Sequence, residues 1–148
     1  MKGFTLIEVL VTLTIISILA AIGIPTYFNQ VEKAREVEVK ILLSSLAIPI
    51  MEYRILNNEY PPDVNAGVNP GLSEWPTDVP FNSILDYDHW AVGENTCIVS
   101  VNHFGRNAFR DAPLYTQVGR AGSIEKVGDD LVKTIAVYEC ENGRGSIR

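Results

Sequence analysis

The apolar run near the amino terminus constrains this chain more than any other feature of its sequence. From Phe4 to Ile24 the only charged residue is Glu8, and most of the others are leucine, isoleucine, valine or alanine. A membrane hydrocarbon core about 30 Å thick needs roughly 20 such residues in a helix. The hydroxyls in the run can bond to helix carbonyls one turn earlier. The run is therefore predicted to be a membrane-length helix.

Glu8 is the residue in this run that requires an explanation. A carboxylate inside hydrocarbon is costly and marks a candidate functional site whose partner must be named. Glu8 follows Phe4 by only four positions, so it could instead sit at headgroup level and be solvated. Depth along the helix leaves both interpretations open.

The residues around the start of the run carry a second signal. The leader Met1-Lys2-Gly3 is too short for an ordinary secretory signal, and Lys2 predicts that the amino end lies inside and the carboxyl end outside. Gly3-Phe4-Thr5-Leu6-Ile7-Glu8, followed by the apolar run, resembles the type III signal sequence of the type IV pilin and pseudopilin superfamily. The resemblance covers the leader and the first helix.

This resemblance implies how the amino terminus is processed and used. A prepilin peptidase would cut between Gly3 and Phe4 and methylate the new amino terminus of Phe4. Glu8 would then pair with the terminal amine of a neighbouring subunit. In a dry helical bundle each of these charges is costly alone and is offset by the other. When a head-to-tail contact between copies is repeated and its rotation does not close into a ring, the copies build an open helical filament.

The helix is predicted to continue past the membrane. Gly23 and Pro25 mark a kink, because proline removes a helix hydrogen bond, although a plain exit from the membrane is the alternative. Beyond it, apolar residues at three- and four-residue steps predict a stripe that packs on the rest of the protein. The stripe is Val31, Ala34, Val37, Ile41, Leu42, Ser45, Leu46, Tyr53 and Leu56.

Three further residues, Val39, Leu43 and Ile50, lie partly off this stripe. They would either face other subunits or widen the core face. Pro49 should distort the helix, and Asn57-Asn58 followed by Tyr60-Pro61-Pro62 should end it.

The rest of the chain is predicted to form a small sheet. Four short strand-like runs are separated by turn residues, at 87–92, 97–102, 114–118 and 131–140. The segment 93–95 suits a tight hairpin turn, whereas 105–107 and 128–130 suit longer loops. Trp75 and Phe81 should attach the loop-rich connection at 63–86 to the head. We predict an α+β fold in which the long helix packs on an antiparallel sheet of three or four strands.

Cys97 and Cys140 are the only cysteines. An even count in an exported domain predicts a disulfide, and the two sulfurs would meet if the strand at Cys97 runs antiparallel beside the last strand. Two buried thiols are the alternative. The resemblance agrees with a disulfide, because many pilins close a carboxyl-terminal loop in this way.

Composition argues against several other functions. The formal net charge is −6 and no Lys/Arg cluster is present, so nucleic-acid binding is not expected. Asp86, Asp88 and His89 are close in sequence, and Asp129-Asp130 could supply oxygens, but no complete calcium loop is visible there or in the tail at 141–148. Solvated turn carboxylates are the favoured interpretation. His103 has no accompanying nucleophile motif. We expect no enzyme activity, cofactor or metal.

Together these features predict a type IV pilus subunit with a leader at 1–3, a membrane and filament-core helix at 4–30, and a helix-plus-head region at 31–148. The resemblance implies a precursor in the inner membrane with its head outside, prepilin peptidase and assembly machinery as partners, and a homo-oligomeric extracellular filament. A type II secretion pseudopilin or minor pilin is the alternative within the superfamily. A single-pass anchored domain that binds a ligand without polymerising is the alternative outside it.

Overall fold

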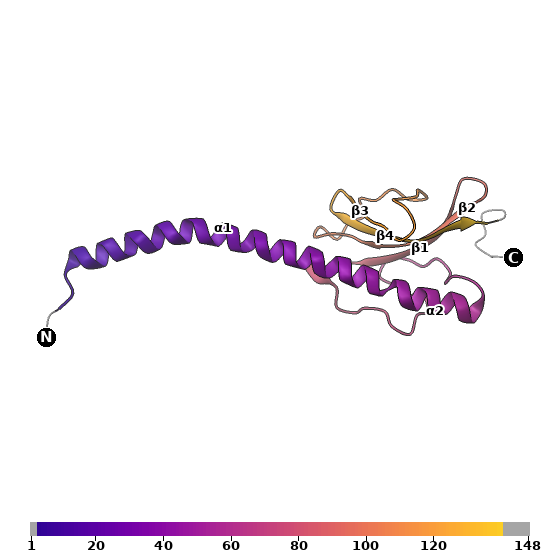
Figure 1. Cartoon of the computed structure of the whole chain (residues 1–148), viewed down its shortest axis with the longest axis horizontal. Coiled ribbons are helices and arrows are strands. Elements are labelled where there is room, and N and C mark those ends of the chain that lie inside the picture. The colour runs from indigo at the N-terminus through magenta and orange to yellow at the C-terminus, as the bar shows by residue number, and fades with distance from the viewer. Residues whose placement is uncertain (1–2, 141–148) are drawn as a thin grey trace. The chain divides into compact units, whose positions relative to one another are not determined.

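The computed structural model describes residues 3–140, and the chain divides after Glu36 into two compact units. Helix α1 (Leu6–Ser45) begins in the first unit and ends in the second. The second unit also contains α2 (Ala47–Asn57) and the whole sheet (Figure 1). Met1, Lys2 and the tail 141–148 lie outside the described residues, so the orientation predicted from Lys2 stays a prediction.

The break between α1 and α2 falls at Leu46, as expected from Pro49. Proline has no N–H to donate, so the carbonyl of Ser45, four residues earlier, loses its helical partner. Regular bonds resume on either side, from Leu46 N to Leu42 O (3.2 Å) and from Ile50 N to Leu46 O (3.3 Å). Helix α2 ends where Asn58 adopts the left-handed conformation (φ 57°), which confirms the predicted stop.

The head contains one antiparallel sheet of four strands in the order β1-β2-β4-β3. The strands are β1 (Leu85–Val92), β2 (Thr96–His103), β3 (Ile124–Val127) and β4 (Asp130–Glu139). Three of them match the runs predicted near 87–92, 97–102 and 131–140. Val92 pairs with Thr96, so the tight turn at 93–95 is confirmed. The α+β prediction is confirmed.

Two local predictions were wrong. The run 114–118 is not a strand, because Pro113 has no N–H for a ladder and Tyr115 takes a left-handed backbone (φ 53°). The fourth strand is β3 instead, a short edge strand. The segment 128–130 is not a longer loop, since Val127 pairs directly with Asp130 across a two-residue turn.

The predicted stripe is only partly the face that packs on the sheet: its Leu46 is buried, and its Leu42 and Tyr53 pack against the core. Val39, Leu43, Leu46 and Ile50 are buried against the sheet, so the off-stripe residues belong to the core. From the predicted stripe, Val37, Ile41 and Leu56 are instead 53%, 65% and 76% exposed. The helix is apolar around much of its circumference, so periodicity alone could not show which face the sheet covers.

The connection between α2 and β1 contacts the β1 edge of the sheet. Gly67 N donates to Leu85 O (2.7 Å), and His89 N donates to Asp63 Oδ1 (2.9 Å). These bonds occupy edge groups of β1 that could otherwise pair with another chain. Trp75 and Phe81 are partly buried against the core, as expected.

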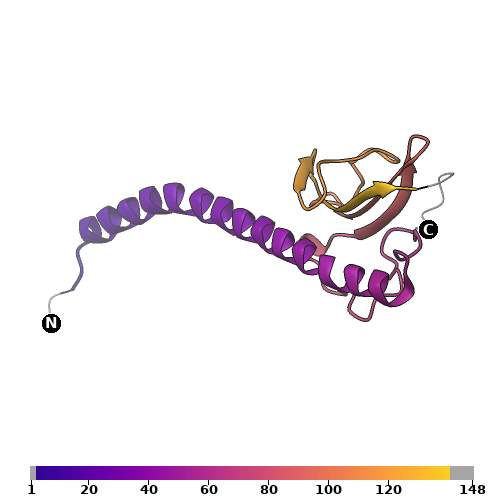
Figure 2. The same cartoon turned by 45° about the vertical axis from the view of Figure 1, so that its right-hand side comes forward.

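The two faces of the sheet differ in polarity. Leu85 and Tyr87 of β1 join the apolar core under the helix, whereas Asp86 and Asp88 alternate to the opposite face. Ser100, Asn102 and Thr134 are also buried polar residues of the sheet. The connection between β2 and β3, residues 104–123, lies over the face opposite α2 (Figures 1 and 2).

Candidate functional site

The start of α1 positions Glu8 through a reciprocal pair of contacts with Thr5. Thr5 N donates to Glu8 Oε2 (2.8 Å), Thr5 Oγ1 donates to the same oxygen (2.7 Å), and Glu8 N lies 3.4 Å from Thr5 Oγ1. Helix α1 begins at Leu6, so this is a capping box with threonine at the cap and glutamate three residues later. Thr5 was not among the predicted site residues, although the Thr-x-x-Glu spacing is visible in the sequence.

The capping box changes the interpretation of Glu8. Both hydrogen bonds that the Glu8 carboxylate accepts from Thr5 go to Oε2, and in the described part of the chain Oε1 has no hydrogen-bond partner. The carboxylate is therefore held at the first turn of the helix, beside Phe4, with one oxygen available to another group. This geometry suits capture of a cation near the amino terminus, where the helix dipole already favours negative charge.

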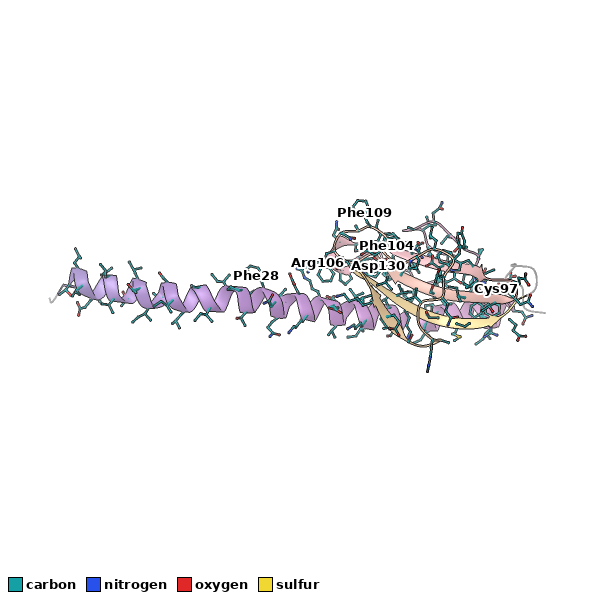
Figure 3. The ribbon with its side chains drawn as sticks, turned by 90° about the horizontal axis from the view of Figure 1, so that it is seen from above. Phe28, Cys97, Phe104, Arg106, Phe109 and Asp130 are labelled. Carbon is teal, nitrogen blue, oxygen red and sulfur yellow. A yellow bond between two sulfur atoms is a disulfide. The ribbon has the colours of Figure 1, made fainter. Side chains whose placement is uncertain are left out.

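The hydroxyl groups in the apolar run beyond Glu8 bond within the helix. Thr12, Thr14 and Ser17 donate to helix carbonyls three or four residues earlier, at 2.7–2.8 Å, as expected. No residue in the most apolar window is buried within the protein, and length and composition suit a membrane-spanning helix. Figure 3 shows these side chains radiating from the helix on the amino-terminal side of Phe28.

Gly23 and Pro25 lie within α1, which is assigned as one continuous helix through both residues. Thr26 Oγ1 donates to Ile22 O (2.9 Å), the carbonyl one turn earlier. The kink predicted at Gly23 and Pro25 stays a prediction.

The second predicted covalent feature lies at one end of the sheet. Cys97 and Cys140 form a disulfide with a Cα–Cα distance of 5.7 Å and 43 residues of separation, which confirms the predicted pairing. Cys97 follows Thr96 at the start of β2, and Cys140 directly follows β4, whose Tyr138 pairs with Cys97. Cys140 N also donates to Asn95 O (3.0 Å). Figure 3 labels Cys97 at this end of the head.

Comparisons with known proteins identify the family. Residues 1–24 match the model of the prokaryotic N-terminal methylation motif. Over 113 residues the chain is 38% identical to the type IV wide pilus major component PilA4 of Thermus thermophilus. The aligned region covers 76% of this chain and 82% of that protein. The chain belongs to the type IV pilin family.

Other pilin relatives match a smaller part of the chain. A fimbrial protein of Neisseria meningitidis is 35% identical over 68 residues, 45% of this chain and 40% of that protein. Prepilin peptidase-dependent protein D of Escherichia coli is 61% identical over 33 residues, 22% of this chain and 23% of that protein. No solved structure gives a significant match. The similarity to these two relatives covers less than half of each.

The pilin head contains a buried charge cluster, and the solvation predicted for its carboxylates was wrong. Asp86 and Asp88 are not solvated turn carboxylates. They lie on β1, 7% and 2% exposed, and both bind Arg110. Arg110 Nη1 lies 2.6 Å from Asp86 Oδ2, and Arg110 Nη2 lies 2.7 Å from Asp88 Oδ2. The guanidinium also stacks over the ring of Trp90, 4.9 Å from its centroid.

The cluster has more negative than positive groups, because two carboxylates share one guanidinium. Burial raises the pKa of Asp88 to about 7, against the opposing hydrogen bonds and charge of Arg110. Burial also raises the pKa of Asp86, and the nearby Asp63 acts in the same direction. The cluster therefore takes up a proton more readily than an exposed aspartate would.

Asp129 and Asp130 bind backbone amides of the β2–β3 connection. Asp130 is fully buried, and its Oδ2 accepts from Asp111 N and Ala112 N at 2.8 Å each. Asp129 Oδ2 accepts from Arg106 N (2.6 Å) and Asn107 N (3.2 Å). Within residues 3–140, no group of three or more histidine, cysteine, aspartate or glutamate side chains is arranged to hold a metal ion.

The two histidines have structural partners. His89 Nδ1 lies 2.8 Å from Pro61 O, and its Nε2 lies 2.6 Å from Tyr138 Oη. A carbonyl only accepts, so Nδ1 carries the proton toward Pro61. His103 likewise donates from Nε2 to Pro80 O (3.1 Å) and accepts at Nδ1 from Gly105 N (3.1 Å). Burial lowers the pKa of His103, which favours this neutral form.

Proposed function

We propose that this chain is the major structural subunit of a type IV pilus and that its role is structural, not enzymatic. The observation that carries the proposal is the similarity to a pilin named as the major component of a wide pilus, which extends over 82% of that protein. The methylation-motif match adds the amino-terminal processing signal. The apolar helix anchors the precursor in the membrane before assembly.

Prepilin peptidase cuts the precursor between Gly3 and Phe4 and methylates the new amine. The precursor lies in the inner membrane with its head outside, and the inner-membrane assembly machinery extracts it into an extracellular helical filament. Residues 4–30 pass from lipid into the filament core during this step. A helix that is apolar on all sides suits both environments, because each removes it from water.

Glu8 aligns neighbouring subunits in this filament. The capping box keeps Oε2 on Thr5, and the second carboxylate oxygen accepts from the methylated amine of Phe4 of a neighbouring copy. A buried carboxylate left without its partner is strongly unfavourable, so subunits shifted along the axis are rejected. Contact between unlike surfaces extends without closing, as a filament requires.

The deciding experiment is mass spectrometry of the protein sheared from the cell surface, with fragmentation of its amino-terminal peptide. We expect abundant filaments whose subunit begins at methylated Phe4. An uncut Met1 terminus, found only in membranes, would overturn the proposal in favour of a single-pass anchored domain. A processed chain that forms only short, scarce filaments beside an abundant second pilin would indicate a pseudopilin or minor pilin.

A further inference from the structure

The membrane-length part of α1 has two chemically distinct ends. The amino end carries the Glu8 carboxylate, and the other end carries the adjacent rings of Tyr27 and Phe28, which Asn29 follows. Between Glu8 and Asn29 the sequence has no charged or amide side chain. The serine and threonine hydroxyls of this stretch donate to helix carbonyls. The two ends therefore limit the length of helix that hydrocarbon can accept.

The backbone at the amino end is unsuited to hydrocarbon. Residues 3–5 are not helical, and the regular ladder of α1 starts with Val9 N donating to Thr5 O (3.3 Å). The capping box provides acceptors for Thr5 N and Glu8 N. The N–H group of Ile7 precedes the ladder, as the first N–H groups of a helix do. Lipid-exposed backbone outside a hydrogen-bonded ladder is strongly unfavourable in hydrocarbon. The first turn, which includes Glu8, therefore requires water or lipid headgroups.

The aromatic pair at the other end suits the opposite headgroup layer. Tyr27 and Phe28 are 66% and 60% exposed, and their rings meet edge to face with 5.9 Å between centroids. Figure 3 labels Phe28 on the helix. Tyrosine has an apolar ring and a hydroxyl that bonds to water or headgroups, so it gathers where hydrocarbon meets water. The first charged residue after the pair is Glu32. This end therefore marks the second boundary of the hydrocarbon.

The distance between the two ends matches the thickness of a bilayer core. A helix rises about 1.5 Å per residue, so Glu8 and Tyr27 of α1 are about 29 Å apart along the axis. The hydrocarbon core is about 30 Å thick. Moving the helix outward by one turn would place Glu8 in hydrocarbon and carry both aromatic rings into water. Moving it inward by one turn would draw Asn29 into hydrocarbon. Both shifts are therefore unfavourable.

We propose that α1 sits in the membrane at one depth, with Glu8 at the inner headgroup level and Tyr27 and Phe28 at the outer headgroup level. The partner is a lipid bilayer whose two headgroup layers contact the two ends of the stretch. This inference rests on the proposed function, because it describes the precursor before assembly.

This depth separates storage of the subunit from the pairing of Glu8. At headgroup level the carboxylate keeps its contact with water, so the membrane holds the charged form at little cost. The carboxylate becomes dry only when the helix enters the filament, where it meets the amine of Phe4 of a neighbouring copy. The penalty for an unpaired charge therefore acts on assembly and not on membrane storage.

The test measures depth in vesicles of phosphatidylethanolamine and phosphatidylglycerol that contain the full-length chain. A nitroxide spin label is attached to one introduced cysteine at a time, Val11→Cys, Ile18→Cys or Ile24→Cys. Cys97 and Cys140 form the disulfide and do not react with the label. Collision of the label with oxygen reports hydrocarbon, and collision with a nickel chelate reports water. The ratio of the oxygen rate to the nickel rate therefore rises with depth.

Two of the labelled positions form a matched pair. Val11 lies three residues inside the boundary at Glu8, and Ile24 lies three residues inside the boundary at Tyr27. We expect equal ratios at these two positions and a several-fold higher ratio at Ile18→Cys. A label at Lys33→Cys is the aqueous reference and should give the lowest ratio.

Two variants should move the helix in opposite directions. Glu8→Leu extends the apolar stretch at the amino end, so the ratio at Val11→Cys should rise above the ratio at Ile24→Cys. Tyr27→Leu combined with Phe28→Leu extends the stretch at the other end and should reverse this order. If neither variant changed the order, the two ends would not set the depth and the inference would be wrong.

The outcomes distinguish a wrong depth from a wrong function. In the chain with only the label, a higher ratio at Val11→Cys than at Ile24→Cys places Glu8 in hydrocarbon and overturns the inference alone. The reverse order overturns it as well, because the aromatic rings then lie in hydrocarbon. Ratios as low at all three positions as at Lys33→Cys would overturn both the depth and the membrane-anchored precursor. Equal ratios in a chain that forms no filaments would overturn the pilus function and leave the depth standing.

Discussion

Arg110 and Asp88 form a two-pronged ion pair that joins the β2–β3 connection to the first strand of the sheet. Arg110 Nη1 donates to Asp88 Oδ1 at 3.0 Å and Nη2 donates to Asp88 Oδ2 at 2.7 Å, while Arg110 Nε donates to Ala112 O at 3.0 Å. The arginine thus satisfies a carboxylate that is 2% exposed and fixes its own backbone at the same time. The ion pair therefore gives the irregular β2–β3 connection a defined position over the polar face of the sheet.

Removing the guanidinium should destabilise the head strongly. Arg110→Met keeps an apolar side chain of similar length but removes the guanidinium that lies over Trp90 and leaves Asp86 and Asp88 buried without a cation, which costs about 3 kcal/mol of unfolding free energy. Denaturant unfolding of the detergent-solubilised chain, followed by tryptophan fluorescence, measures this loss. Arg120→Met on the same connection is the control and should change stability by about 0.5 kcal/mol or less. Equal stability of both variants would contradict the structural role of the ion pair.

The raised pKa of Asp88 predicts a pH dependence of stability. Its pKa is about 7 in the folded head, above the ordinary value of 3.8, so the folded state binds more protons than the unfolded state between these values. The resulting stabilisation is complete below about pH 4 and is lost as the pH rises through about 7. Asp88→Asn removes this contribution, so the stability difference between wild type and variant should change across this window. A constant difference from pH 4 to pH 8 would rule out the shift.

The disulfide should contribute substantially to the stability of the head. Its 43-residue separation corresponds to about 4 kcal/mol in the chain-entropy model, so the double variant Cys97→Ser/Cys140→Ser should melt at a clearly lower temperature under oxidising conditions. A reductant should lower the melting temperature of the wild type toward that of the variant and leave the variant unchanged. Equal melting of the two oxidised proteins would count against a stabilising bridge.

Two variants can separate the capping role of Glu8 from its pairing role. Glu8→Gln keeps a side chain that can complete a capping box but removes the negative charge, so helix formation and membrane insertion should persist while filament yield falls sharply. Thr5→Val removes the capping hydroxyl and keeps the charge, which should cost the helix about 1 kcal/mol and leave most filaments intact. Filament yield in shear preparations measures both. Normal filaments from Glu8→Gln would refute charge pairing.

The sequence by itself determined the features that depend on neighbouring residues. The length and polarity of Phe4–Ile24 specify a membrane-length helix, Pro49 removes one helix hydrogen bond, and Asn58 stops α2 by tolerating a left-handed backbone. Strands β1 and β2 could be predicted because β-favouring residues run between clear turn signals. Thr5 and Glu8 could also have been predicted as a capping box, since their spacing alone encodes the contact.

The tertiary structure decided which surfaces meet. Periodicity could not choose between the stripe at Val37 and Ile41 and the stripe at Val39 and Leu43, because both are apolar and only the position of the sheet distinguishes them. β3 carries Glu125 and Lys126 at its centre and forms because β4 offers it a partner. Asp88 looked like a solvated acid because Arg110, its partner, lies 22 residues away in the sequence. Such contacts form between segments that only the complete fold brings together, so local sequence patterns do not encode them.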